Sequence, residues 1–343
     1  MNSPASISAE AQQIHDQALI IDLHCDLLLT DFFTRLNWGK RHRNPLPFAP
    51  LMGHCDIPRL KEGNIGGLAL GLVTNPLRRR SGPAAISRCL DRMDRAISLH
   101  PTSLTRATTP QAILAARRSG QIACFAGLEG VHGLDGRLEL LAGYQARGLV
   151  YVGLVHFTAN WAARPMVGLG VSKTVGLTDA GRALVDALNT LGILVDVAHL
   201  NAPGVFEVCA RSTAPVICSH TACTAVHRSP RCIDDAQIKA IADTGGLIGV
   251  IFVPAFIGPG GVEAVVAHLN HIRSIAGIDA CAIGTDWEGW AYYPSDLSSA
   301  DKMPRLTQGL LSAGWTPGEI LAAYGGNFMR VLGSVAPRAE RVM

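Results

Sequence analysis

Eight short apolar runs recur along the chain, separated by stretches whose apolar residues have helical spacing. Each run is continuous rather than alternating, which is typical of strands buried on both faces of a parallel sheet. The clearest helical patterns, at 178–192, 234–246 and 261–277, each end at a glycine. The eight predicted strands are residues 19–23, 66–73, 122–128, 149–155, 192–198, 215–219, 246–252 and 281–285.

This succession of strands and helices in 343 residues favours an α/β fold of the (β/α)8 TIM barrel type. We find no linker, internal repeat or low-complexity stretch, so residues 1–343 are predicted to form a single domain. A doubly wound open sheet is the alternative fold. A glycine-rich phosphate loop would support that alternative, but none follows the first predicted strand.

Composition excludes several classes of protein. The net charge is only +3 and the basic residues are scattered, so no nucleic-acid partner is expected. Two short basic clusters, 40–43 and 78–82, are interpreted as solvated loops. The sequence shows no signal-peptide pattern, no apolar run of membrane-spanning length and no lipid-anchor tail, so no membrane association is expected. Nine scattered cysteines without a C-x-x-C pair favour a reducing, cytoplasmic location.

The tripeptide His-Cys-Asp occurs twice, at 24–26 and at 54–56. His24 and Asp26 come where the first predicted strand ends. Residues two apart in a strand point to the same face, so these two side chains can converge at the C-terminal mouth of the barrel. Cys25 is expected to point the other way. The first copy is therefore the candidate for a metal site.

The second copy follows a proline-containing stretch without a strand pattern. Asp56 precedes a short helix-like segment that ends at Gly63, and Pro58 is compatible with its first turn. We therefore interpret Asp56 as a helix N-cap and His54 as a loop residue near the mouth.

Later predicted strands also end in residues that can bind metals. A shared site at the mouth explains this recurrence better than independent structural roles, although each residue taken singly could have a structural role. The residues are Glu129, His156, His199, His220 and Asp286.

Histidine and carboxylate ligands without cysteine suit Zn²⁺ or another divalent transition ion. The set is larger than one catalytic zinc needs, so we expect a binuclear site with ions about 3.5–4 Å apart. A bridging ligand needs two oxygens, which makes Glu129 the natural bridge. A water held between two such ions has a lowered pKa and can act as hydroxide near neutral pH.

Several stretches together resemble the renal (membrane) dipeptidase family of zinc peptidases, within the amidohydrolase-like barrel enzymes. Their order and spacing carry the resemblance. They are "IDLHCD", "DIPRLKEGNIGG", "GLEG", "LVHFTAN", "GLTDAGRALVDALNTLGILVDVAH", "SHTACTAVHRSPR", "DDAQIKAIADTGGLIGV", "IGTDWEG" and "GGNFMRVLG".

The resemblance implies a role for each candidate. One zinc would be held by His24, Asp26 and Glu129, and the other by Glu129, His199 and His220. The substrate-facing histidine of the family matches His156, which would polarise the scissile carbonyl. Asp286 matches the acidic residue that orients the hydroxide and carries its proton to the leaving amine. Arg231, in "SPR", matches the arginine that binds the free carboxylate of the substrate.

The chain departs from the family pattern around the substrate. The departures place apolar or unexpected side chains where the family often has a polar or smaller group, which leaves the reaction class more secure than the substrate. The differing residues are Ile251 and Val253 in "VIFVPAF", Ala163 or Arg164 in "NWAARP", and Trp287 and Glu288 in "TDWEGW".

The leading hypothesis is a binuclear zinc dipeptidase of the cytoplasmic, microbial kind, which hydrolyses small dipeptides, including those with a D-residue at the C-terminal position. A related amidohydrolase acting on N-acyl amino acids, other small amides or lactones is the alternative. A non-catalytic metal-binding barrel is a third reading, but it would require a broken ligand set, and none of the candidate ligands is missing. The resemblance also implies a homodimer.

Overall fold

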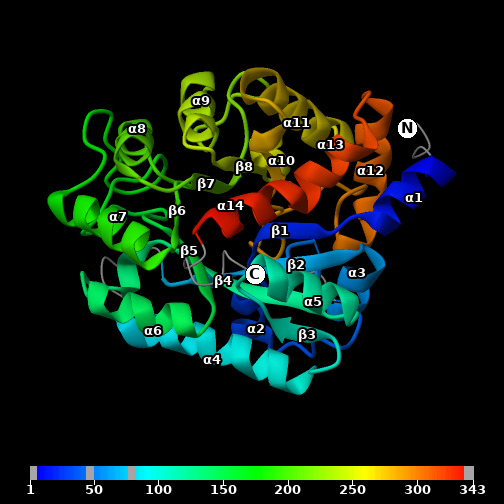
Figure 1. The fold of residues 1–343 in the computed structure, drawn as a ribbon, viewed down its shortest axis with the longest axis horizontal. Helices are drawn as coiled ribbons and strands as arrows, with labels where there is room; N and C mark the ends of the chain where they lie inside the picture. The colour runs from blue at the N-terminus through cyan, green and yellow to red at the C-terminus, as the bar shows by residue number, and fades with distance from the viewer. Residues whose placement is uncertain (1–5, 44–49, 76–81, 336–343) are drawn as a thin grey trace.

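Eight parallel strands follow one another around the barrel in the order β1-β2-β4-β5-β6-β7-β8-β9 (Figure 1). The structure, a computed structural model, describes residues 6–43, 50–75 and 82–335. The (β/α)8 prediction is confirmed. The strands are β1 Ile20–Cys25, β2 Ile65–Val73, β4 Ile122–Glu129, β5 Leu149–Gly153, β6 Leu194–Asp196, β7 Val216–Thr221, β8 Leu247–Val250 and β9 Cys281–Ile283.

Two details differ from the sequence prediction. β5, β6, β8 and β9 are shorter than predicted, whereas β7 extends two residues further and includes His220. A further strand, β3 (Leu104–Arg106), pairs with residues 122–124 of β4 and was not predicted. Three residues are too few to give a recognisable apolar run. Residues 78–81 of the second basic cluster lie outside the described residues.

The barrel is closed between its last and first strands by the chain beyond β9. Asp22 accepts hydrogen bonds from the Thr285 backbone N–H (2.8 Å) and from the Thr285 hydroxyl (2.6 Å). At the mouth, Asp286 N donates to His24 O (3.0 Å) and Asp26 N donates to Trp287 O (2.8 Å). Closure therefore positions the first His-Cys-Asp copy and Asp286 together.

Helix α14 (Asn327–Val335) covers the opposite end of the barrel, crossing the strands in Figure 1. Phe328 stacks on Phe125 from β4, with ring centroids 5.3 Å apart, in the apolar core that fills the barrel. Arg330 donates to the carbonyls of Gly245 and Asp279, which precede β8 and β9. With this end filled by packed side chains, the C-terminal mouth is the accessible end.

The three helices predicted most clearly are present, as α7 (Asp179–Leu191), α9 (Asp235–Asp243) and α11 (Val262–Ala276). Thr178 caps α7 and Asp234 caps α9 through their side chains, as N-cap residues commonly do. Among the described residues, no helix is long and apolar enough to cross a membrane. The other α-helices are α1 Ala9–Gln17, α2 Leu27–Thr34, α3 Ile57–Glu62, α4 Pro83–Leu99, α5 Pro110–Arg118, α6 Leu141–Ala146, α8 Ala202–Arg211, α10 Pro254–Ile257, α12 Met303–Ser312 and α13 Pro317–Leu321.

His268 ties α11 to two neighbouring segments. Its Nδ1 accepts a hydrogen bond from Cys223 N (3.0 Å), and its Nε2 donates to Ile257 O (3.1 Å). The ring is therefore neutral, because Nδ1 acts as an acceptor. Burial lowers the pKa of His268 from 6.5 to about 4.

We predict that His268 contributes to acid lability. Below pH 6.5 the unfolded chain binds a proton that the folded chain takes up only near pH 4, so this stability is present above pH 6.5 and is lost as the pH falls. Between pH 7 and pH 4 the wild type should lose up to about 3 kcal/mol more than His268→Gln. Urea unfolding of both chains with a chelator, at several pH values, checks this. Parallel pH curves would contradict it.

Candidate metal centre

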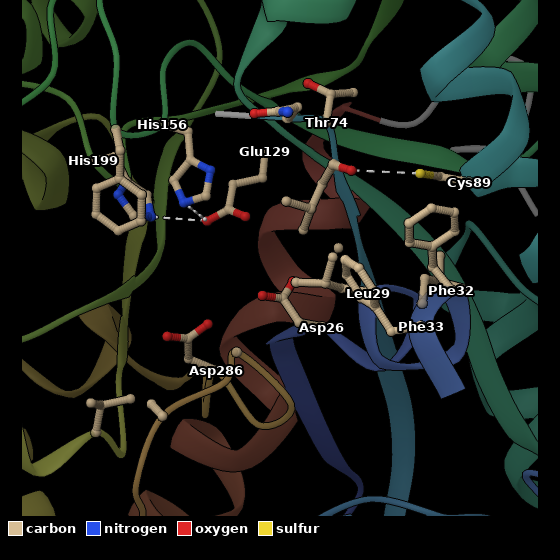
Figure 2. Close-up of a pocket in the computed structure, with 18 of the residues that line it drawn as sticks. Asp26, Leu29, Phe32, Phe33, Thr74, Cys89, Glu129, His156, His199 and Asp286 are labelled. Carbon is tan, nitrogen blue, oxygen red and sulfur yellow. Dashed lines mark hydrogen bonds and ion pairs between the residues drawn. The ribbon is translucent and has the colours of Figure 1, made fainter. Parts of the chain in front are cut away.

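Glu129, the last residue of β4, lies at the centre of the predicted site (Figure 2). Four histidines from different parts of the barrel direct their Nε2 atoms at one of its oxygens, and all of them are buried. The structure therefore brings together residues that are far apart in sequence. Measured to Glu129 Oε1, the distances are 2.9 Å for His199, 3.3 Å for His156, 3.5 Å for His220 and 3.7 Å for His24.

Asp26 and Asp286 complete the cluster on the side of His24. His24 Nε2 lies 3.3 Å from Asp26 Oδ1 and 3.9 Å from Asp286 Oδ1. Gly71 of β2 makes room here, since a Cβ at this position would lie 2.4 Å from Asp26 Oδ1. His24 and Asp26 converge as expected, although Asp26 is the first residue beyond β1 rather than part of the strand.

The strand-end prediction holds for the shared location but not for every position. Glu129 and His220 belong to their strands, whereas His156, His199 and Asp286 each lie three residues beyond the end of a strand. His199 and Asp286 have positive φ values of 64° and 62°. Such backbone is uncommon outside glycine, and it turns these two side chains back into the mouth.

Three groups of side chains have ligand atoms close enough together to share an ion. They are His24–Glu129–His220, Glu129–His156–His199, and His24–Asp26–Asp286. Glu129 belongs to two of them, as a bridging ligand would. The grouping is not identical to the one that the family resemblance implies, because His156 adjoins His199 here and His24 adjoins His220.

The donor atoms fit divalent cations. His24 Nε2, Asp26 Oδ1 and Glu129 Oε2 are buried and have no hydrogen-bond partner among the described residues. Buried polar groups without partners are costly, and a bound ion would satisfy all three. His and carboxylate donors in this proportion suit zinc or a similar transition ion.

The charges in the cluster favour a cation as well. Burial raises the pKa of the Glu129 carboxyl well above its usual range, and burial together with Asp26 raises the pKa of Asp286 to about 7. For His24, burial lowers the pKa, but Glu129 and Asp26 outweigh it and raise the value to about 10. Positive charge is therefore stabilised next to these three carboxylates.

Hydrogen bonds behind the cluster orient two of the histidines. His24 Nδ1 lies 3.2 Å from the Tyr151 hydroxyl, which donates to Leu23 O (2.7 Å), so His24 Nδ1 carries the proton. His220 Nδ1 lies 2.9 Å from the Ser219 hydroxyl, which donates to Asp196 (2.6 Å). In both rings Nδ1 is therefore the donor to a fixed hydroxyl, and Nε2 is the atom that faces the site and binds a metal once it carries no proton.

Asp22 and Asp196 each fix the residue that precedes a member of the site, and the sequence analysis missed both. Each is a buried strand carboxylate that accepts hydrogen bonds from the backbone N–H and the hydroxyl of the residue just before a site residue. Asp22 binds Thr285, which precedes Asp286, and Asp196 binds Ser219, which precedes His220. An aspartate inside an otherwise apolar strand, as in "IIDL" and "LVDV", is the signal that could have found them.

Arg231 lines the same cavity and is only 2% exposed. Its guanidinium donates to His220 O (2.9 Å), with longer contacts to the Thr221 hydroxyl and the Met166 sulfur. Within residues 6–43, 50–75 and 82–335, no carboxylate forms a salt bridge with it. A buried guanidinium without an acidic partner is suited to binding an anionic group of a ligand.

The second His-Cys-Asp copy is structural, as predicted for Asp56, which caps α3 by accepting from Arg59 N (2.9 Å). Its loop is fixed by Glu288, whose buried carboxylate accepts the backbone N–H groups of Gly53, His54 and Cys55. Cys55 is buried, like Cys25 of the first copy. Glu288, noted only as a departure from the family pattern, thus joins the loop after β9 to the segment before α3.

The model of the membrane dipeptidase family, peptidase family M19, matches residues 8–342. The chain belongs to this family. It is accordingly a metal-dependent hydrolase of the dipeptidase type, and the resemblance inferred from its motifs is confirmed.

Solved structures of similar fold agree over nearly the whole chain. The probable dipeptidase PvdM from Pseudomonas aeruginosa is 20% identical with a TM-score of 0.84, and the match covers 95% of this chain and 97% of that one. A metallopeptidase from Rhodobacter sphaeroides, liganded with a phosphinate mimic of the dipeptide L-Ala-D-Ala, is 23% identical with a TM-score of 0.79. That match covers 93% of this chain and 99% of the other.

We predict that the two His-Cys-Asp copies respond differently to substitution. His24→Ala removes a candidate ligand and should lower the bound metal. His54→Ala should retain the wild-type content, because His54 Nδ1 donates to Ser298 O (2.6 Å), outside the cluster. Elemental analysis of the purified proteins measures this. Loss of metal in His54→Ala alone would mean that the wrong copy has been assigned.

Tyr151→Phe should weaken metal binding without unfolding the barrel. The substitution removes the hydroxyl that orients His24, and loss of such a partner typically costs about 10- to 100-fold in affinity. Competition with a chelator of known affinity gives the change. Tyr324→Phe is the matched control, since its buried hydroxyl bonds to Thr307 (2.8 Å), away from the site. Equal affinity in both variants would contradict the assigned role.

Proposed function

We propose that the protein is a binuclear zinc dipeptidase that hydrolyses small dipeptides, including those with a D-residue at the C-terminal position. The observation that carries the proposal is the convergence of four histidine Nε2 atoms on Glu129 in a cavity that also contains the buried Arg231. The dipeptide mimic bound to the Rhodobacter metallopeptidase supports the stereochemistry.

Two Zn²⁺ ions would be held by the set that the family resemblance implies, with Glu129 as the shared ligand. The residues are His24, Asp26, Glu129, His199 and His220. When bound, the ions would polarise the scissile carbonyl and supply a water of lowered pKa as the nucleophile. Tyr151 and the pair Ser219–Asp196 keep the Nε2 atoms of His24 and His220 available for that purpose.

Three further side chains act on the substrate in this proposal. Arg231 binds the carboxylate of the C-terminal residue, which gives its guanidinium the anionic partner it lacks. His156 donates a hydrogen bond to the carbonyl oxygen as negative charge develops there. Asp286 takes the proton of the attacking water and passes it to the leaving amine. The homodimer implied by the resemblance stays a prediction, which sedimentation would check.

Asp286→Asn should separate catalysis from metal binding. The amide keeps the shape of the side chain but cannot accept the proton, so kcat for a dipeptide such as Gly-Ala should fall by at least about 100-fold. Metal content, measured on the same sample, should remain near that of the wild type. Removal of metal from the wild type with a chelator should abolish hydrolysis, and added Zn²⁺ should restore it.

Either of two outcomes would refute the proposal. One is that the zinc-loaded wild type hydrolyses no dipeptide of either stereochemistry. The other is that Asp286→Asn keeps full activity. A zinc content of one ion per chain in a fully active enzyme would refute the binuclear part alone.

A further inference from the structure

The cavity at the mouth extends well beyond the candidate metal ligands. Its volume is about 1100 Å³, above the usual range of small-molecule sites. On one side its wall consists of apolar side chains from α2, the end of β2 and α4 (Figure 2). The residues that form this apolar wall are Leu28, Leu29, Phe32, Phe33, Val73 and Cys89.

The apolar wall lies across the barrel from Arg231. In the cyclic order of eight strands, β2 and β7 are four positions apart and therefore on opposite sides. Arg231 bonds to residues at the end of β7, whereas the apolar wall is built on β2 and on the helices after β1 and β2. Figure 2 shows Glu129 and Asp26 between the histidines and this wall.

Aromatic side chains extend the wall to the surface. Phe32 and Phe33 are 53% and 60% exposed, and their rings pack against each other at the edge of the cavity, with centroids 4.8 Å apart. Phe33 packs edge-on against Trp290 from the loop after β9, with centroids 5.1 Å apart, and the guanidinium of Arg92 lies over the Phe32 ring at 4.5 Å. These contacts hold an apolar rim at the entrance.

The charged groups on this side are basic. Arg88 and Arg92 of α4 line the cavity here, and among its described lining residues the acidic ones are the cluster members Asp26, Glu129 and Asp286. A cationic group on a substrate would be repelled by these two arginines, whereas a neutral apolar group would contact the apolar side chains of the wall. The wall therefore selects for apolar and against basic groups.

We propose that the apolar wall is a subsite for a large apolar group on the acyl side of the scissile amide. This rests on the proposed function, because Arg231 at the far end fixes the direction of the substrate through its carboxylate. The group can be the side chain of an amino-terminal residue, such as phenylalanine or leucine, or the chain of an N-acyl amino acid. Both present the same chemistry to the apolar wall.

Substrate pairs that differ only in that group test the proposal. Burial of an aromatic or long aliphatic group should raise kcat/KM by about 10- to 100-fold for Phe-Ala over Gly-Ala, and likewise for N-octanoyl-alanine over N-acetyl-alanine. Lys-Ala should be a poorer substrate than Phe-Ala by a similar factor. Whichever series shows the preference identifies the source of the group.

Two variants with matched controls locate the effect. Leu29→Trp fills the subsite and should reduce the Phe-Ala to Gly-Ala ratio of kcat/KM by about 10-fold, while Leu114→Trp, on α5 outside the cavity, leaves the ratio unchanged. Phe33→Ala, at an exposed position, should reduce the ratio by about 3-fold or more. Phe206→Ala, on α8 and also exposed, is its control.

The failures are distinguishable. Equal kcat/KM for Phe-Ala and Gly-Ala, or a Leu29→Trp effect of the same size on all substrates, overturns the subsite but leaves the dipeptidase intact. If no substrate is hydrolysed, the proposed function fails. Calorimetric binding of N-octanoyl-alanine against N-acetyl-alanine, in wild type and Leu29→Trp, then decides the subsite, which is refuted if the two ligands bind equally.

Discussion

The hydrogen bonds between Asp22 and Thr285 are the interaction on which the rest of the site depends. β1 and β9 are not paired as neighbouring strands, and the chain just beyond β9 meets β1 in one isolated bridge, between Cys25 and Trp287. The buried carboxylate of Asp22 adds two hydrogen bonds to this seam. It lies two residues before His24 and binds the residue just before Asp286. The same bonds that close the barrel therefore set the distance between these two site residues.

Asp196 makes the same kind of contact elsewhere at the mouth. It accepts hydrogen bonds from Ser219, and the Ser219 hydroxyl orients His220. Both carboxylates are fully surrounded by protein, and burial raises the pKa of each, Asp22 to about 6. Hydrogen bonds from the hydroxyls of Thr285 and Ser219, and from backbone N–H groups, oppose that rise in pKa. The site is thus supported by a second layer of acids that hold strands and orient ligands but do not face the cavity.

The sequence was most informative where a pattern is repeated. Eight apolar runs of similar length predicted the strands, and the recurrence of His, Asp and Glu after them brought Glu129 and its histidines to one place. The sequence was less informative where the direction of a side chain depends on the backbone conformation of a single residue. The backbone at His199 and Asp286 has positive φ, which no spacing rule predicts for these residue types.

Partners formed by distant segments were also beyond reach. Tyr151 and Glu288 act through atoms of residues more than a hundred positions away, and nothing in their local sequence distinguishes them from ordinary barrel and loop residues. The same holds for the apolar wall, whose members come from two helices and one strand end. Its residues read as ordinary apolar positions until the fold shows that they face a cavity.

The barrel is closed by segments from near the start and near the end of the chain, and this determines when the site can form. The Thr285 contact spans 263 residues, and α14, which fills the base of the barrel, is the last element described. Contacts of such long sequence separation form late, because loop closure must precede them. A chain still emerging from the ribosome holds His24 and Asp26 without Asp286 or the base of the barrel, so the complete cluster can assemble only after the chain has been made as far as α14.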